Sequence, residues 1–140
     1  MSHYKFFDHT ADIGVEVKGR TRKALFVNAA HALCDVMIEN KTGRKASRRQ
    51  KTIIVEGADI ADLLINFLRE LLDLFNGEQF VTDGCEIIKF TNKELQARLT
   101  GETFNNKKHL IKTEIKAVTY SGAKVERIKT GWRARVIFDV

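Results

Sequence analysis

The chain of 140 residues contains no proline and only two cysteines. The absence of proline, together with only nine glycines, excludes collagen-like chains, proline-rich segments and flexible linkers. Cys34 and Cys85 show neither the CxxC spacing of a zinc site nor the density of a disulfide framework. The start of the chain lacks the apolar core of a secretion signal, and no apolar run is long enough to cross a membrane. We therefore expect a cytoplasmic protein.

Familiar catalytic signatures are also missing. The sequence has no glycine-rich phosphate loop before a helix, no HExxH motif and no GxSxG motif. Its four histidines lack the spacing of metal ligands. The sequence therefore offers no identifiable nucleophile or general base.

The sequence has a globular composition with unevenly distributed charge. It is 44% hydrophobic and 30% charged, which is typical of a single folded domain, here residues 1–140. The net charge is +6, and residues 41–51 alone carry six basic and no acidic side chains. We interpret this basic stretch in two ways, as a solvated loop or as a segment that binds RNA phosphates. It contains no aromatic residue, so base stacking there is not supported.

Hydrophobic periodicity predicts an α+β fold. Thr21 can cap a helix over residues 22–37 with one apolar stripe, and Asp59 opens a second helix that Asn76-Gly77 ends. Consecutive strands on short turns imply antiparallel pairing, so we expect a mainly antiparallel sheet system packed against two helices. The expected strands are residues 4–7, 12–18, 53–55, 80–90, 94–100, 111–120, 124–129 and 132–138, with turns at 92–93, 121–122 and 130–131.

Acidic residues at strand ends indicate a candidate site. Asp139 lies on the non-core face of its strand, one residue before Val140, and Asp12 begins an earlier strand on its non-core face. If these two strands pair antiparallel, Asp12, Asp139 and the Val140 carboxylate converge. Convergent carboxylates repel one another unless a cation joins them. Hard oxygen ligands of this kind suit Mg²⁺ or Ca²⁺ better than zinc.

A lysine could supply the positive charge instead. In the strand expected at 111–120, Lys112, Glu114 and Lys116 share the face that is available to a site. The alternative is that the two aspartates are ordinary surface residues and that this strand has a solvated face. The residue pattern alone leaves both interpretations open.

Residues 7–15, FDHTADIGV, open a series of motifs that continues in order along nearly the whole chain. This segment resembles the N-terminal signature of the archease family. Its most specific stretch resembles Gly101-Glu102, followed by His109 and by residues 112–120, KTEIKAVTY. Further similarities lie at residues 25–30 and 67–72, at Trp132, and at residues 136–140, VIFDV.

The resemblance implies a non-catalytic accessory protein. Archeases act with the RtcB-type RNA ligase of tRNA splicing and RNA repair, where they promote guanylylation of the ligase's active-site histidine and restore multiple turnover. By motif position, the resemblance implies that Asp12 and Asp139 bind a divalent metal, calcium or magnesium, with Val140 as a carbonyl or carboxylate ligand. It also implies that Lys116 takes part in activation.

Two functions of other classes compete with this expectation. A general RNA-binding or RNA-chaperone module would use the basic stretch at 41–51, and its affinity would fall steeply with salt. A metal-dependent hydrolase would use the same acids, but it would need a nucleophile or general base that the sequence does not identify.

Overall fold

The computed structural model describes residues 3–9, 12–43 and 48–140. These residues form nine strands and two helices, in the order β1 (Tyr4–His9), β2 (Asp12–Gly19), α1 (Arg22–Met37), β3 (Ile38–Asn40), β4 (Arg49–Glu56), α2 (Ile60–Glu78), β5 (Phe80–Phe90), β6 (Glu94–Thr103), β7 (His109–Ile111), β8 (Ala117–Ile128) and β9 (Gly131–Asp139). None of the helices in this described part of the chain is long and apolar enough to cross a membrane.

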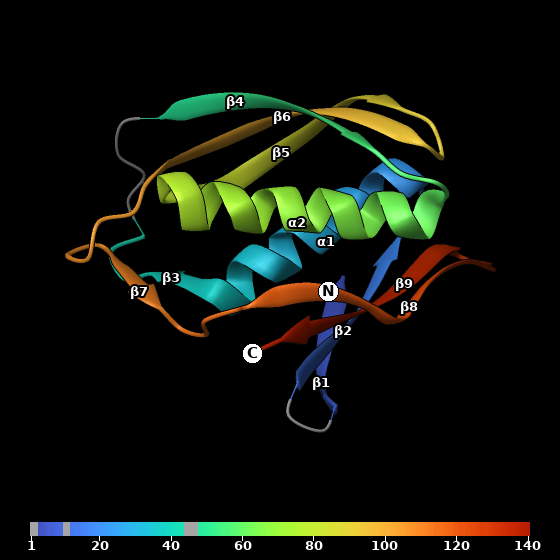
Figure 1. Cartoon of the computed structure of the whole chain (residues 1–140), viewed down its shortest axis with the longest axis horizontal. Coiled ribbons are helices and arrows are strands. Elements are labelled where there is room, and N and C mark those ends of the chain that lie inside the picture. The colour runs from blue at the N-terminus through green and yellow to red at the C-terminus, as the bar shows by residue number, and fades with distance from the viewer. Residues whose placement is uncertain (1–2, 10–11, 44–47) are drawn as a thin grey trace.

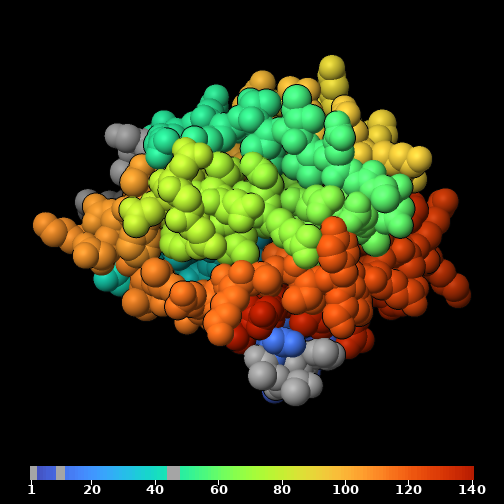
Figure 2. All heavy atoms as spheres, in the orientation of Figure 1, coloured from blue at the N-terminus to red at the C-terminus, as the bar shows by residue number. Residues whose placement is uncertain are grey.

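The elements are stacked in three layers (Figure 1). One antiparallel sheet has the strand order β1-β2-β9-β8, and the other has the order β4-β6-β5. The two helices lie between these sheets, and the short pair β3-β7 lies at one end. The α+β architecture expected from the sequence is confirmed. On the face shown in Figure 2, the outer side of α2 remains visible between β4 and β8.

The position of α1 between two sheets explains why its apolar residues are not confined to the single stripe predicted from the sequence. A helix that is covered by a sheet on both sides must be apolar around most of its circumference. The buried side chains of α1 accordingly include both Leu25 and Phe26 and both Ala29 and Ala30, which are neighbours in sequence. The small alanines let the sheets approach the helix closely, and the core continues into α2.

The predicted helix starts are confirmed at atomic detail. The Thr21 hydroxyl accepts a hydrogen bond from the Ala24 N–H at 3.0 Å. Asp59 and Asp62 cap α2, since the Asp59 carboxylate accepts from the Asp62 N–H at 2.8 Å and the Asp62 carboxylate accepts from the Ala58 N–H at 2.8 Å.

The predicted end of α2 is wrong by two residues. The helix continues through Asn76 and Gly77, which are exposed, because a glycine on the helix surface costs only about 1 kcal/mol and does not break the helix. The helix stops at Gln79, which adopts a left-handed conformation (φ 56°) and donates its N–H to the Phe75 carbonyl at 2.8 Å. There the chain must turn, because the next side chain, Phe80, is buried in the core.

The expected strand at 111–120 is confirmed from Ala117 and is wrong over residues 112–116, and the expected turn at 121–122 is wrong. Residues 112–116 form no strand, and Lys112 instead donates its N–H to the Met37 carbonyl at the end of α1. Ser121-Gly122 lies inside the single strand β8, where the register with β9 shifts between Thr119 and Lys124. Gly122, with φ +70°, allows this irregularity without ending the strand.

The basic stretch is partly ordered as a strand. Its last residues, from Arg49, belong to β4, which is longer than the strand expected at 53–55. Residues 44–47 lie outside the described residues. The strand β3, which the sequence did not predict, pairs with β7.

We expect the core to tolerate loss of side-chain volume poorly. Ile65→Ala in α2 removes a side chain with 0% exposure and should lower the free energy of unfolding by about 2–5 kcal/mol. Ile54→Ala in β4 is the matched control, because Ile54 is 65% exposed, and it should cost about 1 kcal/mol or less. Urea unfolding measures both, and equal losses would contradict the layered core.

Candidate functional site

The residues predicted to form a site lie at neighbouring ends of three strands. In the antiparallel pair of β2 and β9, Ile13 lies opposite Phe138, so the same register brings Asp12 next to Asp139. On the other side of β9, Ala117 at the start of β8 lies opposite Asp139. The backbone therefore brings the two aspartates to the same end of one sheet.

Lys116 reaches the same place through a backbone hydrogen bond. Its N–H donates to the Asp139 carbonyl at 2.8 Å, although residues 112–116 are not a strand. The Lys116 side chain is exposed, whereas Asp12, Asp139 and Val140 are half-buried. The four residues predicted from the sequence, Asp12, Lys116, Asp139 and Val140, thus lie at the same end of this sheet.

Buried neighbours hold this end of the sheet in place. Phe138, the residue before Asp139, and Val118, two residues after Lys116, are both fully buried. A slip of one residue in either strand would expose these side chains and bury the charged ones. The positions of the polar residues are therefore fixed by the core beneath them.

The donor set suits a hard cation better than a soft one. The described residues contain no group of three or more His, Cys, Asp or Glu side chains placed to hold a metal ion. At the strand ends, the available ligands are two carboxylates and the backbone oxygens of Val140. Oxygen donors alone fit Mg²⁺ or Ca²⁺ rather than zinc.

Side-chain contacts of Arg69, here called the Arg69 latch, join α2 to β8 two residues after Lys116. The sequence did not predict them. Arg69 on α2 donates its Nε–H to the Val118 carbonyl at 3.0 Å, and its guanidinium lies 4.4 Å from the centre of the Tyr120 ring. The Tyr120 hydroxyl donates to the Asn66 side chain at 3.2 Å. A hydrogen bond with the Asp62 carboxylate raises the pKa of Tyr120. The pKa of Asp62 is lowered mainly by the hydrogen bond from the Ala58 N–H and, to a smaller extent, by the one with Tyr120.

The described cations of the basic stretch make contacts within their own chain. Arg48 forms an ion pair with Asp83, and Lys51 forms one with Glu78. Arg49 donates to the Thr103 hydroxyl at 2.9 Å, and the Lys41 ammonium donates to the Asn106 carbonyl at 3.3 Å. Side chains held in this way are less available to follow an RNA backbone.

A second polar cluster, centred on Glu102, is buried. Glu102 is 4% exposed, and its carboxylate contacts the Lys108 ammonium at 2.8 Å and the His109 Nε2 at 2.7 Å. The Asn105 N–H donates to His109 Nδ1, so Nε2 carries the proton and donates to Glu102. The cluster closes residues 103–108 into a fixed loop. Its signal in the sequence was the Gly101-Glu102 motif followed by His109.

Comparison with known proteins gives a consistent result over the full length. A sequence model described as the Archease protein family (MTH1598/TM1083) matches residues 4–140. The protein archease of Pyrococcus abyssi is 37% identical over the whole of both chains. The protein archease of Methanosarcina acetivorans is 33% identical, over 98% of this chain and 95% of the relative.

Solved structures agree with the sequence comparison. The solution structure of protein 1598 from Methanobacterium thermoautotrophicum covers 100% of both chains, with a TM-score of 0.79 and 30% identity. The crystal structure of an archease from Thermotoga maritima, with 23% identity, covers 97% of this chain and 96% of its own, with a TM-score of 0.63. The second likeness extends the shared fold to a more distant sequence.

The buried Glu102 cluster should be important for stability. Glu102→Ala removes the partner of Lys108 and His109, and a buried charge left without its partner typically costs about 3–5 kcal/mol. Glu86→Ala is the matched control, because the Glu86–Arg98 ion pair is exposed and should contribute about 1 kcal/mol or less. Thermal or urea unfolding compares the two, and a cost for Glu102→Ala no larger than the control's would contradict this role.

Proposed function

The chain belongs to the archease family, and we propose that it activates an RtcB-type RNA ligase of tRNA splicing and RNA repair. In this role the protein is an accessory factor rather than an enzyme. It promotes guanylylation of the ligase's active-site histidine and so restores multiple turnover.

The observation that carries this proposal is the strand register around Asp139. Asp12, Asp139 and the backbone of Lys116 meet because β9 pairs with β2 on one side and with β8 on the other. These are the residues on which sequence pattern and family resemblance agree. Neighbouring strand ends that present acids beside a lysine suit electrostatic positioning at another protein's active site.

We propose that Asp12, Asp139 and a backbone oxygen of Val140 hold a divalent cation, calcium or magnesium. The ion would supply concentrated positive charge for a phosphate group. Lys116, exposed beside Asp139, pairs with a carboxylate of the ligase or a phosphate of its nucleotide. The Arg69 side chain holds the start of β8, two residues after Lys116, through its hydrogen bond to the Val118 carbonyl.

Guanylylation of the ligase tests the proposal directly. With the protein at one-tenth of the ligase concentration, Asp139→Asn and Asp12→Asn should each lower the stimulated rate by about tenfold or more, the loss typical of a disturbed metal site. Glu56→Gln is the matched control, because Glu56 is exposed on β4, which belongs to the other sheet, and it should stimulate normally. Full stimulation by Asp139→Asn would overturn the role proposed for Asp12 and Asp139.

Two further measurements separate the components of the proposal. Calorimetric titration with Ca²⁺ and Mg²⁺ should detect binding to the unmodified protein and weaker binding to Asp12→Asn. RNA binding without the ligase, at high affinity and with a steep decrease as salt rises, would favour the RNA-binding module instead.

A further inference from the structure

The sheet β1-β2-β9-β8 has an outer face that neither α1 nor α2 covers, because both helices lie on its other side (Figure 1). Residues directly opposite each other in antiparallel strands point to the same face of a sheet. One row of such residues crosses all four strands and consists of Lys5, Glu16, Arg135 and Lys124. The next row crosses three strands and consists of Lys18, Arg133 and Glu126. We call these two rows the basic face.

Positive charge exceeds negative charge on the basic face. Its two rows contain five lysine or arginine side chains and two glutamates. Glu126 is shared between two cations, because it accepts a hydrogen bond from the Arg133 Nε–H at 3.0 Å and forms an ion pair with the Lys124 ammonium at 3.2 Å. The remaining cations are exposed and form no ion pair in the described part of the chain; they are Lys5, Lys18 and Arg135.

The Arg135 guanidinium is held by an aromatic ring and not by a carboxylate. Its central carbon lies 4.3 Å from the centre of the Phe7 ring, and Phe7 lies opposite Gly14. Gly14 makes room for the ring, since a Cβ atom at this position would lie 2.2 Å from it. Glu16, opposite Arg135 on β2, forms no ion pair with it within the described residues. The N–H donors of Arg135 are therefore available to a ligand, and the ring restrains the planar group before binding.

A cavity of about 310 Å³ is lined by residues of both rows. Lys124, Arg133 and Arg135 bring positive charge to its wall, whereas Glu16 and Glu126 bring negative charge. Its volume lies within the range typical of small-molecule sites, about 300–1,000 Å³. The cavity thus has room for the phosphate and sugar of one nucleotide beside three cations.

We propose that the basic face binds a single strand of RNA through its phosphates, with one base stacked on the outer side of the Arg135 guanidinium. Phosphate oxygens accept hydrogen bonds from arginine and lysine, and arginine planes stack on unpaired bases. Successive rows on one face are two residues apart, roughly 6.7 Å, which is close to the separation of neighbouring phosphates in an extended strand. Double-stranded RNA would offer no free base to the guanidinium. The choice of RNA over DNA rests on the proposed function.

The basic face lies beside the residues proposed to act on the ligase. Asp139 lies on the same face of β9, four residues beyond Arg135, which corresponds to roughly 13 Å along the strand. The row between them carries no charge and includes Phe7 and Ile137. An RNA strand that follows β9 would therefore lead from the cations to the acids proposed to hold a metal ion. In this arrangement the protein contacts the RNA substrate of the ligase as well as the ligase.

Fluorescence anisotropy with a short labelled oligouridylate tests the proposal on the protein alone. About three phosphate contacts predict a modest dissociation constant in physiological salt, about 10⁻⁴ to 10⁻⁶ M, and a shallow logarithmic salt dependence with a slope of about 2. Arg135→Gln should raise the dissociation constant by about fivefold or more, because it removes a phosphate contact and a stacking plane. Lys18→Gln, which leaves the Phe7 contact intact, should also raise it.

Arg98→Gln is the matched control, because Arg98 is exposed on β6 in the other sheet and the substitution removes the same charge. It should leave the affinity nearly unchanged. Absence of oligouridylate binding, or an equal effect of Arg135→Gln and Arg98→Gln, would overturn the proposal. An oligoglutamate that binds as tightly as the RNA would also overturn it and would indicate an acidic protein as the occupant.

Amide chemical shifts of the unmodified protein provide a test that needs no variant to fold. The oligouridylate should shift the amide signals of Lys18, Glu126 and Arg135, which lie on the basic face. Shifts confined to residues 48–51 would place the RNA at the basic stretch of the sequence and would contradict the proposal.

A failure of this proposal is distinguishable from a failure of the ligase role. The anisotropy measurement contains no ligase, and guanylylation is measured without RNA. Arg135→Gln should stimulate guanylylation normally, and loss of stimulation would show that the basic face contacts the ligase itself, which would overturn the RNA assignment. Full stimulation by Asp139→Asn would overturn the ligase role and would leave the measured RNA affinity as it is.

Discussion

The pairing of β2 with β9 is the constraint on which the rest of the structure depends. These two strands are the centre of their sheet, and their inward side chains, including Val15, Val17, Val136 and Phe138, are almost fully buried. Alternation along a strand has a period of two, so a slip of one residue would turn these side chains out of the core. The same register brings Asp12 beside Asp139. The candidate site is thus a consequence of how the core packs.

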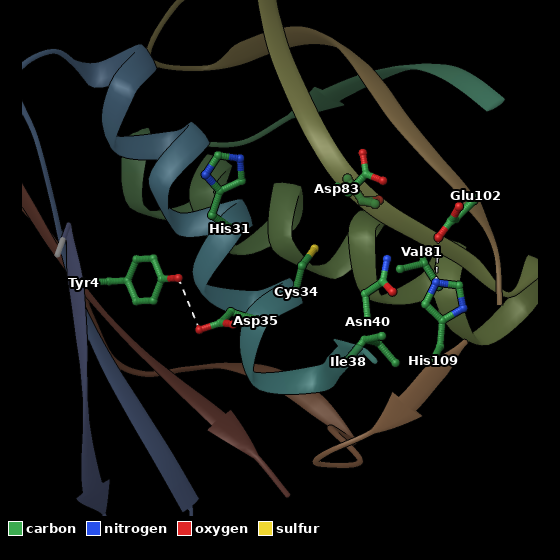
Figure 3. Close-up of a pocket in the computed structure, with 11 residues that line it drawn as sticks. Tyr4, His31, Cys34, Asp35, Ile38, Asn40, Val81, Asp83, Glu102 and His109 are labelled. Atoms are coloured by element: carbon green, nitrogen blue, oxygen red, sulfur yellow. Dashed lines mark hydrogen bonds and ion pairs between the residues drawn. The ribbon is translucent and has the colours of Figure 1, made fainter. Parts of the chain in front are cut away.

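The position of α1 between the two sheets determines both its composition and the side chains that meet beside it. Each sheet needs only one apolar face, but α1 is covered by both sheets and must bury most of its surface, which accounts for its alanines. α1 contacts β1 of one sheet and β5 of the other, and both strands lie at sheet edges. Polar side chains from α1 and from these edges therefore meet beside the helix. A cavity lined by Tyr4, Asp35 and Asp83 lies at this meeting point (Figure 3).

Local signals predicted those elements whose boundaries depend on nearby residues. The caps at Thr21 and Asp59 and the long strand at 80–90 are confirmed, because each follows from residues within one turn or one strand. Where neighbouring layers decide, the prediction was wrong. α2 passes through Asn76-Gly77, and β8 passes through Ser121-Gly122, because continued packing and pairing outweigh a local preference for a turn.

The sequence by itself determined the fold class, the family resemblance and the chemistry available at the strand ends. Alternation placed Asp12 and Asp139 on non-core faces, since that depends only on the period of a strand. Only the tertiary structure decided what lies beside them. The Arg69 latch, the buried Glu102 cluster and the cavity at Asp35 each join residues from separate elements. Such contacts depend on strand order and layer packing, which bring together residues that no local pattern relates.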